Sequence, residues 1–270
     1  MRKTVLITGA SSGIGKATAI ALAKAGHKVY GAGRSTARMQ GLAAEGITPL
    51  AMDVADEASI SAAVNRIMES DGAIDILINN AGYGEFGPIE QIPMDKARYQ
   101  MEVNLIGPAR LVQLVLPAMR AKGWGKIVNV SSIGGKLATA FGGWYHASKF
   151  ALEGWSDALR QEVRPFGIDV IVIEPGAVKT EWGSIAVDNM LLHAEGTAYE
   201  TAAAKRHNGL KTSDAAGADP VVIADLIMEA LTAERPKARY VGGAFAAELL
   251  ESRKNMTDEA FDAMITEMLS

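Results

Sequence analysis

Short runs rich in β-branched residues alternate with longer amphipathic segments from the start of the chain to about residue 175. The short runs are typical of strands and the longer segments are typical of helices. Strands are expected at residues 3–8, 28–32, 47–52, 74–79, 126–131 and 168–173, and helices at residues 14–25, 35–44, 56–70, 95–121 and 144–164. This alternation predicts βαβ units and therefore a parallel sheet.

The last third of the chain has a different pattern. Residues 181–218 mix apolar clusters with many small residues and show no clear period, so a substrate-binding lid or a mobile loop is expected there. Regular structure then returns, with helices expected at residues 219–233, 245–252 and 257–268 and a last strand at 238–242. Because no linker or repeat interrupts the chain, we expect residues 1–270 to form one α/β domain. Its core would be a doubly wound, mostly parallel sheet of about seven strands with helices on both faces.

Composition and charge narrow the class of protein. Hydrophobic residues make up 49% of the 270 residues and charged residues 21%, as in ordinary globular proteins. A net charge of −4 gives no general attraction for nucleic acid. The chain has no cysteine, and its four histidines are far apart, so no metal site is expected. Its apolar runs are too short for a signal peptide or a membrane span, so a cytoplasmic location is expected.

The first predicted strand leads directly into a glycine-rich turn, "TGASSGIG". Glycines at this point, before the first helix, let backbone N–H groups approach a pyrophosphate at the positive end of the helix. The alternative is a tight turn that binds nothing. The position of the turn, after a first strand in a parallel alternation, favours a dinucleotide site. The residues concerned are Gly9, Ser11, Ser12, Gly13, Ile14 and Gly15.

Polar and glycine residues also follow three later strands. "NNAG" ends at Gly82 after the fourth strand, Ser131 and Ser132 follow the fifth, and Pro175 and Gly176 follow the sixth. The carboxyl ends of parallel strands lie at one edge of the sheet, where open α/β sheets bind ligands. We therefore expect these loops to line one crevice.

Tyr145 and Lys149 are four residues apart in a predicted helix. They would lie on one face, where the ammonium group could stabilise the phenolate and lower the pKa of the tyrosine. Taken alone, this spacing more often marks an ordinary amphipathic helix.

Six motifs together resemble the short-chain dehydrogenase/reductase family over nearly the whole chain. In order they are "TGASSGIG", "NNAG", Asn104 in "EVNLIGP", "VNVSS", "YHASK" and "PGAVKT". The layout is most similar to the hydroxysteroid and retinol dehydrogenase branch. The resemblance implies a Rossmann fold and an enzyme that transfers a hydride between a nicotinamide cofactor and a carbonyl or secondary alcohol.

The resemblance also implies roles for individual residues. Tyr145 would be the acid/base, and Ser132 would hydrogen-bond the substrate oxygen. Lys149 would lower the pKa of Tyr145 and hold the nicotinamide ribose. Asn104 would hold a water for proton relay. In addition to the glycine turn, Tyr145 and Lys149, the cofactor would contact Asp53 and Val54 at the adenine, Asn80, Ala81 and Gly82 at the adenosine ribose, and Pro175, Gly176, Val178 and Thr180 near the nicotinamide.

The second strand indicates which cofactor is used. Enzymes of this fold that use NAD normally place an acidic residue about 20 residues beyond the glycine motif. Here no Asp or Glu occurs from Lys16 to Ala44, and Gly33 occupies the expected position. Arg34 follows, where a guanidinium could pair with a 2′-phosphate, although it could also be an ordinary surface arginine. We therefore predict NADP(H), with Arg38 as a weaker second candidate.

The substrate and the assembly are less sharply indicated. An apolar carbonyl or secondary alcohol is expected because the segments predicted to line the pocket are mostly apolar and carry few charges. A homo-oligomer is expected because helices 95–121 and 144–164 are long, and relatives pair these helices. The pocket residues are Tyr83, Phe86, Leu137, Phe141, Trp182, Met190, Leu191 and Leu192, with the charged Glu85, Lys136 and Asp188.

Two other functions remain open. One is a dinucleotide-binding sensor or regulator on the same fold, since a fold alone does not confer activity. The other is an epimerase or dehydratase of the extended relatives, which typically have a longer substrate domain. The presence of Asn104, Ser132, Tyr145 and Lys149 together favours the oxidoreductase.

Overall fold

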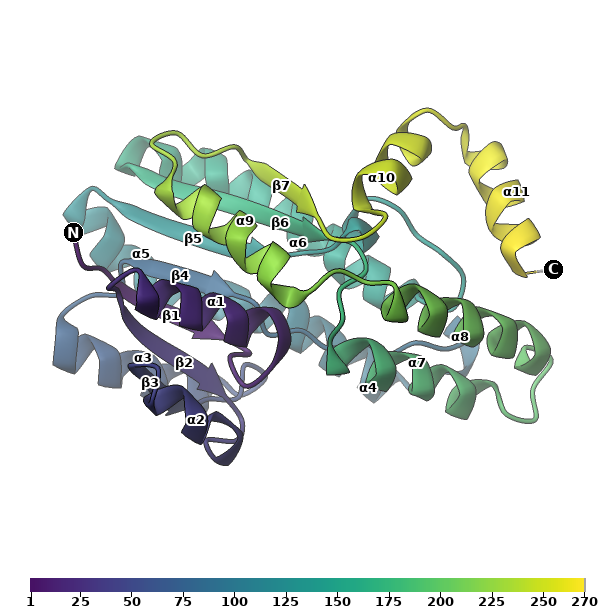
Figure 1. The fold of residues 1–270 in the computed structure, drawn as a ribbon, viewed down its shortest axis with the longest axis horizontal. Coiled ribbons are helices and arrows are strands. Elements are labelled where there is room, and N and C mark those ends of the chain that lie inside the picture. Colours follow the sequence, from purple (N-terminus) through teal and green to yellow (C-terminus); the bar gives the residue numbers. More distant parts are fainter. Residues whose placement is uncertain (270) are drawn as a thin grey trace.

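A seven-stranded parallel sheet forms the centre of the protein, as the alternation of strands and helices predicted (Figure 1). The structure is a computed structural model that describes residues 1–269, apart from the side chains of residues 182, 184, 185, 268 and 269. The strands lie in the order β3-β2-β1-β4-β5-β6-β7. Their bounds are β1 Thr4–Thr8, β2 Lys28–Gly33, β3 Ile47–Ala51, β4 Ile76–Asn79, β5 Gly125–Val130, β6 Ile168–Pro175 and β7 Arg239–Gly242.

The order of the strands reverses beside β1. Leu6 of β1 pairs with Tyr30 of β2 on one side and with Leu77 of β4 on the other. The chain therefore winds outward in opposite directions from the gap between β1 and β4. In open α/β sheets this reversal point opens a crevice at the carboxyl ends of the strands, and ligands bind there.

Helices cover both faces of the sheet, and none of the described helices is long and apolar enough to cross a membrane (Figure 1). Core contacts place α3, α5 and α6 on one face and α1, α2 and α9 on the other. The bounds are α1 Gly13–Lys24, α2 Gln40–Ala43, α3 Glu57–Asp71, α4 Met94–Met101, α5 Gly107–Lys122, α6 Gly143–Val163, α7 Glu181–Ala194, α8 Glu200–Ala215, α9 Pro220–Thr232, α10 Ala246–Lys254 and α11 Asp258–Leu269.

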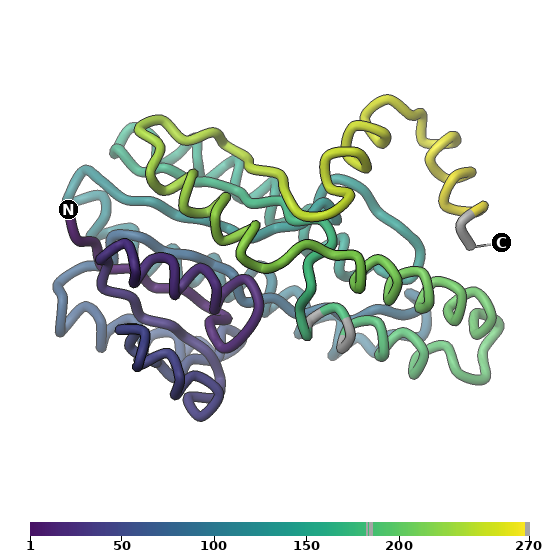
Figure 2. Tube along the Cα trace, in the orientation of Figure 1, coloured from purple at the N-terminus to yellow at the C-terminus, as the bar shows by residue number. Residues whose placement is uncertain are grey.

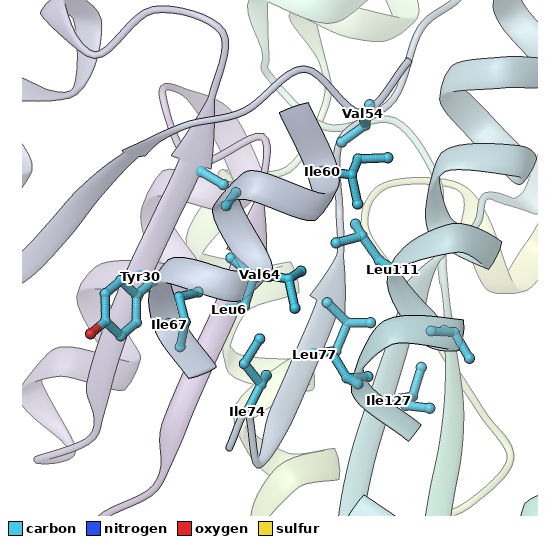
Figure 3. Close-up of a cluster of buried hydrophobic side chains, with 14 of the residues drawn as sticks. Leu6, Tyr30, Val54, Ile60, Val64, Ile67, Ile74, Leu77, Leu111 and Ile127 are labelled. Carbon is cyan, nitrogen blue, oxygen red and sulfur yellow. The ribbon is translucent and has the colours of Figure 1, made fainter. Parts of the chain in front are cut away.

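Successive residues of the central strands enter different cores. In β1, Leu6 packs with α3 and α5, as Figure 3 shows, whereas Val5 and Ile7 pack with α1 and α9. All three side chains are fully buried. Because successive side chains of a strand point to opposite faces, a strand covered on both sides must be apolar throughout, which explains the continuous apolar runs of the sequence.

The predicted helix over residues 95–121 is interrupted. It consists of α4, a π-helical turn at Glu102–Ile106 and then α5. A Cβ added at Gly107 would lie 2.0 Å from the carbonyl oxygen of Val54, so the chain packs directly against a neighbouring loop at this point. π turns are often found at functional sites, and this one carries Asn104.

The expected lid or mobile loop at residues 181–218 is not irregular, because most of this segment forms α7 and α8; a lid remains a prediction. These two helices lie with α10 and α11 beyond the carboxyl ends of the strands, and Figure 2 shows α11 far from the amino terminus. Small and polar residues dominate α8, so its sequence lacks a helical apolar period. Contacts of Ala203 with the apolar cluster that includes Met190 of α7 give α8 its buried face.

Candidate active site

The glycine-rich turn between β1 and α1 packs closely against the loop after β4. Gly9 has a φ of +69°, and a Cβ there would lie 2.8 Å from Asn80 Nδ2. A Cβ at Gly15 would lie 2.2 Å from the carbonyl oxygen of Gly9. Both positions therefore require glycine.

Thr8 and Asn80 hold the two loops together. The backbone N–H groups of Asn80 and Ala81 donate to Thr8 Oγ1 at 3.0 and 2.8 Å, and Asn80 Nδ2 donates to the Thr8 carbonyl at 2.9 Å. These bonds cross the point where the strand order reverses. The mouth of the crevice is therefore fixed by hydrogen bonds rather than by apolar packing alone.

A cavity of about 420 Å³ opens at this edge of the sheet. All of the expected cofactor and catalytic residues line it except Gly15 and Asn104. Gly15 lies behind the turn, and Asn104 lies behind Gly82. The expected residues that line the cavity are Gly9, Ser11, Ser12, Gly13, Ile14, Arg34, Asp53, Val54, Asn80, Ala81, Gly82, Ser132, Tyr145, Lys149, Pro175, Gly176, Val178 and Thr180.

Tyr145 lies in the first turn of α6 and faces Ser132, which follows β5. Burial raises the pKa of Tyr145 to about 12, and a hydrogen bond with Ser132 acts in the opposite direction. The Ser132 side chain also accepts from the Gly134 N–H at 3.0 Å, which fixes its position. Without a bound ligand, Tyr145 is therefore a protonated phenol at neutral pH.

Lys149 lies one turn further along α6 and is almost completely buried. Its Nζ donates to the carbonyl of Val130 at 2.9 Å and lies 6.0 Å from the centre of the Tyr145 ring. Burial lowers the pKa of Lys149 to about 8, while the charge of Glu153 raises it. The ammonium group is thus retained at neutral pH beside the tyrosine.

Asn104 is a structural link as well as a candidate for proton relay. Its Oδ1 accepts from the Tyr83 N–H at 2.8 Å, and its Nδ2 donates to the Tyr83 carbonyl and to Ser148 Oγ, both at 2.9 Å. Ser148 in turn donates to the carbonyl of Tyr145 at 2.7 Å. Because both amide protons are engaged, a bound water would have to use an acceptor position of Asn104.

The two candidate arginines have different surroundings. Arg34 is exposed at the end of β2, lines the cavity, and has its Nη1 3.4 Å from the hydroxyl of Tyr99. Arg38 forms an ion pair of 2.5 Å with Glu181 at the start of α7. Among the described residues no carboxylate pairs with Arg34, so its guanidinium is available to an anion.

A buried apolar cluster lies beside Tyr145. Phe86 stacks near Tyr145, with 5.3 Å between ring centres, and Phe141 and Met190 belong to the same buried cluster. These residues come from the loop after β4, the loop before α6 and the helix α7. Two loops and the α7–α8 pair thus meet around the phenol.

Several pocket residues predicted from the sequence do not face this cluster. Leu192 is 71% exposed and Leu191 is 37% exposed, so both lie on the outer side of α7, which the helical period sets. Tyr83 packs edge-on against Tyr99 and lines the cavity. Leu137 is buried, and the side chain of Trp182 lies outside the described residues.

The charges predicted in the pocket have partners. Glu85 is buried and accepts from Tyr83 and, at 2.7 Å, contacts His193 of α7. Lys136 lies 3.1 Å from Glu153. Asp188 pairs on the surface with His207 and Lys211.

Sequence reasoning missed some residues that line the cavity. Tyr99, Glu181 and Asp214 belong to this group. No motif marks them, because each reaches the crevice only through the packing of α4, α7 or α8.

The model of the family described as "short chain dehydrogenase" matches residues 3–189. The chain belongs to the short-chain dehydrogenase family. The resemblance based on six motifs is therefore confirmed.

Curated relatives of this short-chain dehydrogenase span several substrate types. A "3-ketodihydrosphingosine reductase" of Bacteroides thetaiotaomicron is 44% identical over 65% of this chain and 64% of that protein. The "probable short-chain type dehydrogenase/reductase VdlC" of Helicobacter pylori is 36% identical over 96% and 95% of the two chains. Human "17-beta-hydroxysteroid dehydrogenase type 1" is 34% identical over 88% of this chain and 77% of that protein.

Solved structures agree with the fold. A short-chain dehydrogenase from Streptomyces avermitilis matches with a TM-score of 0.82 and 34% identity, over 98% of this chain and 95% of that one. A metagenomic short-chain oxidoreductase in complex with NADP matches with a TM-score of 0.72 and 26% identity, over 90% and 97%. A nicotinamide dinucleotide is thus the cofactor class of this family.

The residues at the glycine turn fit such a cofactor. A Cβ at Gly13 would lie 3.0 Å from the Thr180 side chain, so glycine keeps this narrow part of the crevice open. Within the described part of the chain, no side chain caps the start of α1 at Ser12. The first N–H groups of the helix can therefore bind a pyrophosphate.

Replacing Asn104 by Ala should lower the free energy of unfolding by about 2 kcal/mol or more, because buried polar groups lose their partners. Thermal and urea denaturation measure this effect. Gln113→Ala, which removes an exposed partner of Arg110, is the control and should change stability by less than about 0.5 kcal/mol. Equal stability of the two variants would show that the hydrogen bonds of Asn104 contribute nothing to the fold.

Proposed function

We propose that this protein is an NADP(H)-dependent oxidoreductase that transfers a hydride between nicotinamide and a largely apolar carbonyl or secondary alcohol. The observation that supports it best is that Tyr145, Ser132 and Lys149 line the same cavity as the glycine turn. A phenol, a hydroxyl and an ammonium group thus surround a place where a carbonyl oxygen could lie next to a cofactor. Tyr145 is the acid/base of the reaction.

In the direction of reduction, each residue acts on the substrate oxygen or on Tyr145. The bound cofactor supplies the hydride chemistry. Ser132 donates a hydrogen bond to the carbonyl oxygen, and Tyr145 transfers its proton to that oxygen as the alcohol forms. Lys149 stabilises the resulting phenolate by its charge.

The protonation states support this direction at neutral pH. A phenol with a pKa of about 12 holds its proton, while a lysine with a pKa of about 8 holds its charge. Oxidation of an alcohol needs the phenolate instead, so it should be favoured as the pH rises. Asn104, through its acceptor positions, would hold the water that returns a proton to the site.

The remaining cofactor contacts follow from the position of each loop in the cavity. The turn from Gly9 to Gly15 would bind the pyrophosphate, and Val178 and Thr180 the nicotinamide carboxamide. The loop residues Asp53, Val54, Asn80, Ala81 and Gly82 would surround the adenosine, and Pro175 and Gly176 would lie beside the nicotinamide. Arg34 would bind the 2′-phosphate.

An apolar substrate is supported by the cluster of Phe86, Phe141 and Met190 beside Tyr145. The names of two relatives refer to 3-ketodihydrosphingosine and to 17-beta-hydroxysteroids, which are largely apolar compounds with an oxygen at a ring or chain carbon. We infer that α7 and α8 form the lid over such a substrate. A sensor that only binds the dinucleotide is the alternative, but it would not need Ser132 and Tyr145 at the same cavity.

We also propose a homo-oligomer. The outer face of α6 exposes Phe150 in a stripe of small residues at positions 147, 154 and 158, and the neighbouring π turn exposes Ile106. Phe150 is 46% exposed and Ile106 is 48% exposed. Small residues allow two helices to approach closely, and exposed apolar side chains favour burial against a second copy.

Replacing Tyr145 by Phe removes the proton that is transferred but preserves the ring. We expect turnover with NADPH on apolar ketones and aldehydes to fall at least ~100-fold. The affinity for NADPH, measured by fluorescence titration, should change little. Undiminished turnover in this variant would exclude Tyr145 as the acid.

The cofactor preference should depend on Arg34. A charge-assisted pair contributes roughly 1.5–3 kcal/mol, so kcat/KM should favour NADPH over NADH by about 10- to 100-fold. Arg34→Ala with Gly33→Asp should reverse this preference. An added Cβ at Gly33 would lie 3.3 Å from the Sδ atom of Met39 and 4.0 Å from Cβ of Ser11, so it fits with a small shift of the Met39 side chain.

Arg38→Ala is the matched comparison, because Arg38 is paired with Glu181. We expect it to reduce the preference less than Arg34→Ala does. A native enzyme that prefers NADH would contradict the role of Arg34. A variant with Arg34→Ala and Gly33→Asp that still prefers NADPH would contradict this role as well.

The oligomer should dissociate when Phe150 is replaced by Glu, because two charges would then face each other across the apolar contact. Light scattering at micromolar concentration measures the mass of both proteins. Leu192→Glu, on the exposed side of α7, is the control and should leave the mass unchanged. A native protein with the mass of one chain would refute the proposal.

A further inference from the structure

A cluster of charged side chains lies beside α6, next to the proposed catalytic residues. Its two central members, Glu153 of α6 and Glu174 of β6, have side chains that are only 4% and 3% exposed. Arg239 of β7 lies 3.0 Å from Glu153 Oε2 and 3.2 Å from Glu174 Oε1, and Lys136 lies 3.1 Å from Glu153. The other members are Asp157 and Arg160 of α6.

Glu153 is placed directly behind Lys149. The two residues are one helical turn apart on the same face of α6, and helical side chains lean toward the amino end of their helix. A Cβ at Gly135 would lie 2.9 Å from Glu153 Cγ and 3.1 Å from the carbonyl oxygen of Lys149. The loop that carries Ser132 thus passes over both residues.

Few charged groups face Lys149. Its own helix contributes Tyr145 and Glu153, the π turn contributes the neutral Asn104, and β5 contributes the carbonyl of Val130. Glu153 is the charge that raises the pKa of Lys149 against the effect of burial. No charged side chain of α10, which also packs near this loop, contacts the cluster within the described residues.

Glu174 adds a second carboxyl group to this position. Burial, and next the charge of Glu153, raise the pKa of Glu174 to about 7, while Lys136 and Arg239 oppose this rise. In the described part of the chain, Oε1 of Glu153 is buried without a hydrogen-bond donor, and Oε1 of Glu174 is paired with Arg239 at 3.2 Å without an aligned hydrogen bond. Loss of the proton of Glu174 near neutral pH adds a negative charge behind Lys149.

Asp157 is a third carboxylate partner of Arg239 where β7 meets α6. Asp157 accepts two hydrogen bonds of 2.8 Å from Arg239. Its side chain is 37% exposed, so the desolvation of its charge is less unfavourable than that of the two buried glutamates. Burying two further carboxyl groups beside Lys149 is unfavourable unless they serve another purpose. Their position points to an effect on the lysine.

We propose that Glu153 is a positioning residue whose carboxylate, held by Arg239 and Lys136 and coupled to Glu174, keeps Lys149 positively charged beside Tyr145. The consequence for catalysis rests on the proposed function, because Lys149 matters to the reaction only if Tyr145 transfers a proton. The electrostatic link itself concerns only residues of this chain.

The link is tested by NMR on the cofactor-free protein with [ε-¹³C]lysine, with the Lys149 signal assigned by its absence in Lys149→Met. The native signal should titrate near the pKa of about 8. In Glu153→Gln the midpoint should fall by roughly one pH unit, since an opposite charge at close range has been removed. In Glu174→Gln it should fall by less.

Asp157→Asn is the matched control, because it also removes a carboxylate partner of Arg239 but lies a further turn away from Lys149. It should leave the Lys149 midpoint in place. If Glu153→Gln does not fold, Glu153→Gln with Lys136→Met removes one charge of each sign and should still lower the midpoint. A midpoint equal to the native one in a folded Glu153 variant, or an equal shift in Asp157→Asn, overturns the proposal.

The same variants are then assayed for reduction with NADPH. The alkaline limb of the pH profile of kcat/KM should move to lower pH by the same amount as the Lys149 midpoint. A stability role for Glu153 would lower the melting temperature without moving this limb, and that result would also overturn the proposal. If the Lys149 midpoint falls in Glu153→Gln but the native protein reduces no carbonyl, the proposed function fails while the link between Glu153 and Lys149 stands.

Discussion

The hydrogen bonds of Thr8 hold the site together. They join the carboxyl ends of β1 and β4 at the point where the strand order reverses, and Thr8 Oγ1 accepts from two backbone N–H groups there. Every other part of the crevice is placed relative to these two loops. The glycine turn can approach Asn80 only because Gly9 has no side chain, and Asn104 in turn holds the backbone of Tyr83 in the same loop.

Burial creates the chemical properties of the site. Removing Tyr145 and Lys149 from water moves their pKa values apart, to about 12 and about 8, so the phenol holds its proton more firmly while the amine keeps its charge over a narrower range of pH than in water. Two neighbours oppose these shifts: Ser132 favours the phenolate and Glu153 favours the ammonium. A proton donor and a stabilising charge can thus coexist one helical turn apart.

Two kinds of structure surround Tyr145. Strand ends and short loops line the cavity on one side, whereas a buried cluster that includes residues of α7 and α8 lies on the other. Contacts tie α7 to the rest of the protein near both of its ends, through an ion pair of Glu181 with Arg38 and a hydrogen bond between His193 and Glu85. The α7–α8 pair is therefore connected to the segments that follow β2 and β4.

The sequence alone determined most of the fold and the identity of the central residues. Alternation of apolar runs placed the strands, because strands covered on both faces must be apolar throughout, and the motifs at Gly9, Tyr145 and Lys149 pointed to residues that line one cavity. Only the tertiary structure showed the π turn at Asn104 and the close packing of Gly107, which follows it, against Val54.

Tertiary packing also determined that residues 181–194 and 200–215 form the helices α7 and α8, and that Leu191 and Leu192 face outward. It likewise brought Glu153 and Glu174 to Arg239, which lies 86 residues beyond Glu153 in the chain. The local sequence indicates which side chains of a segment are buried. Which distant segment meets it depends on both partners at once, and no local pattern records that.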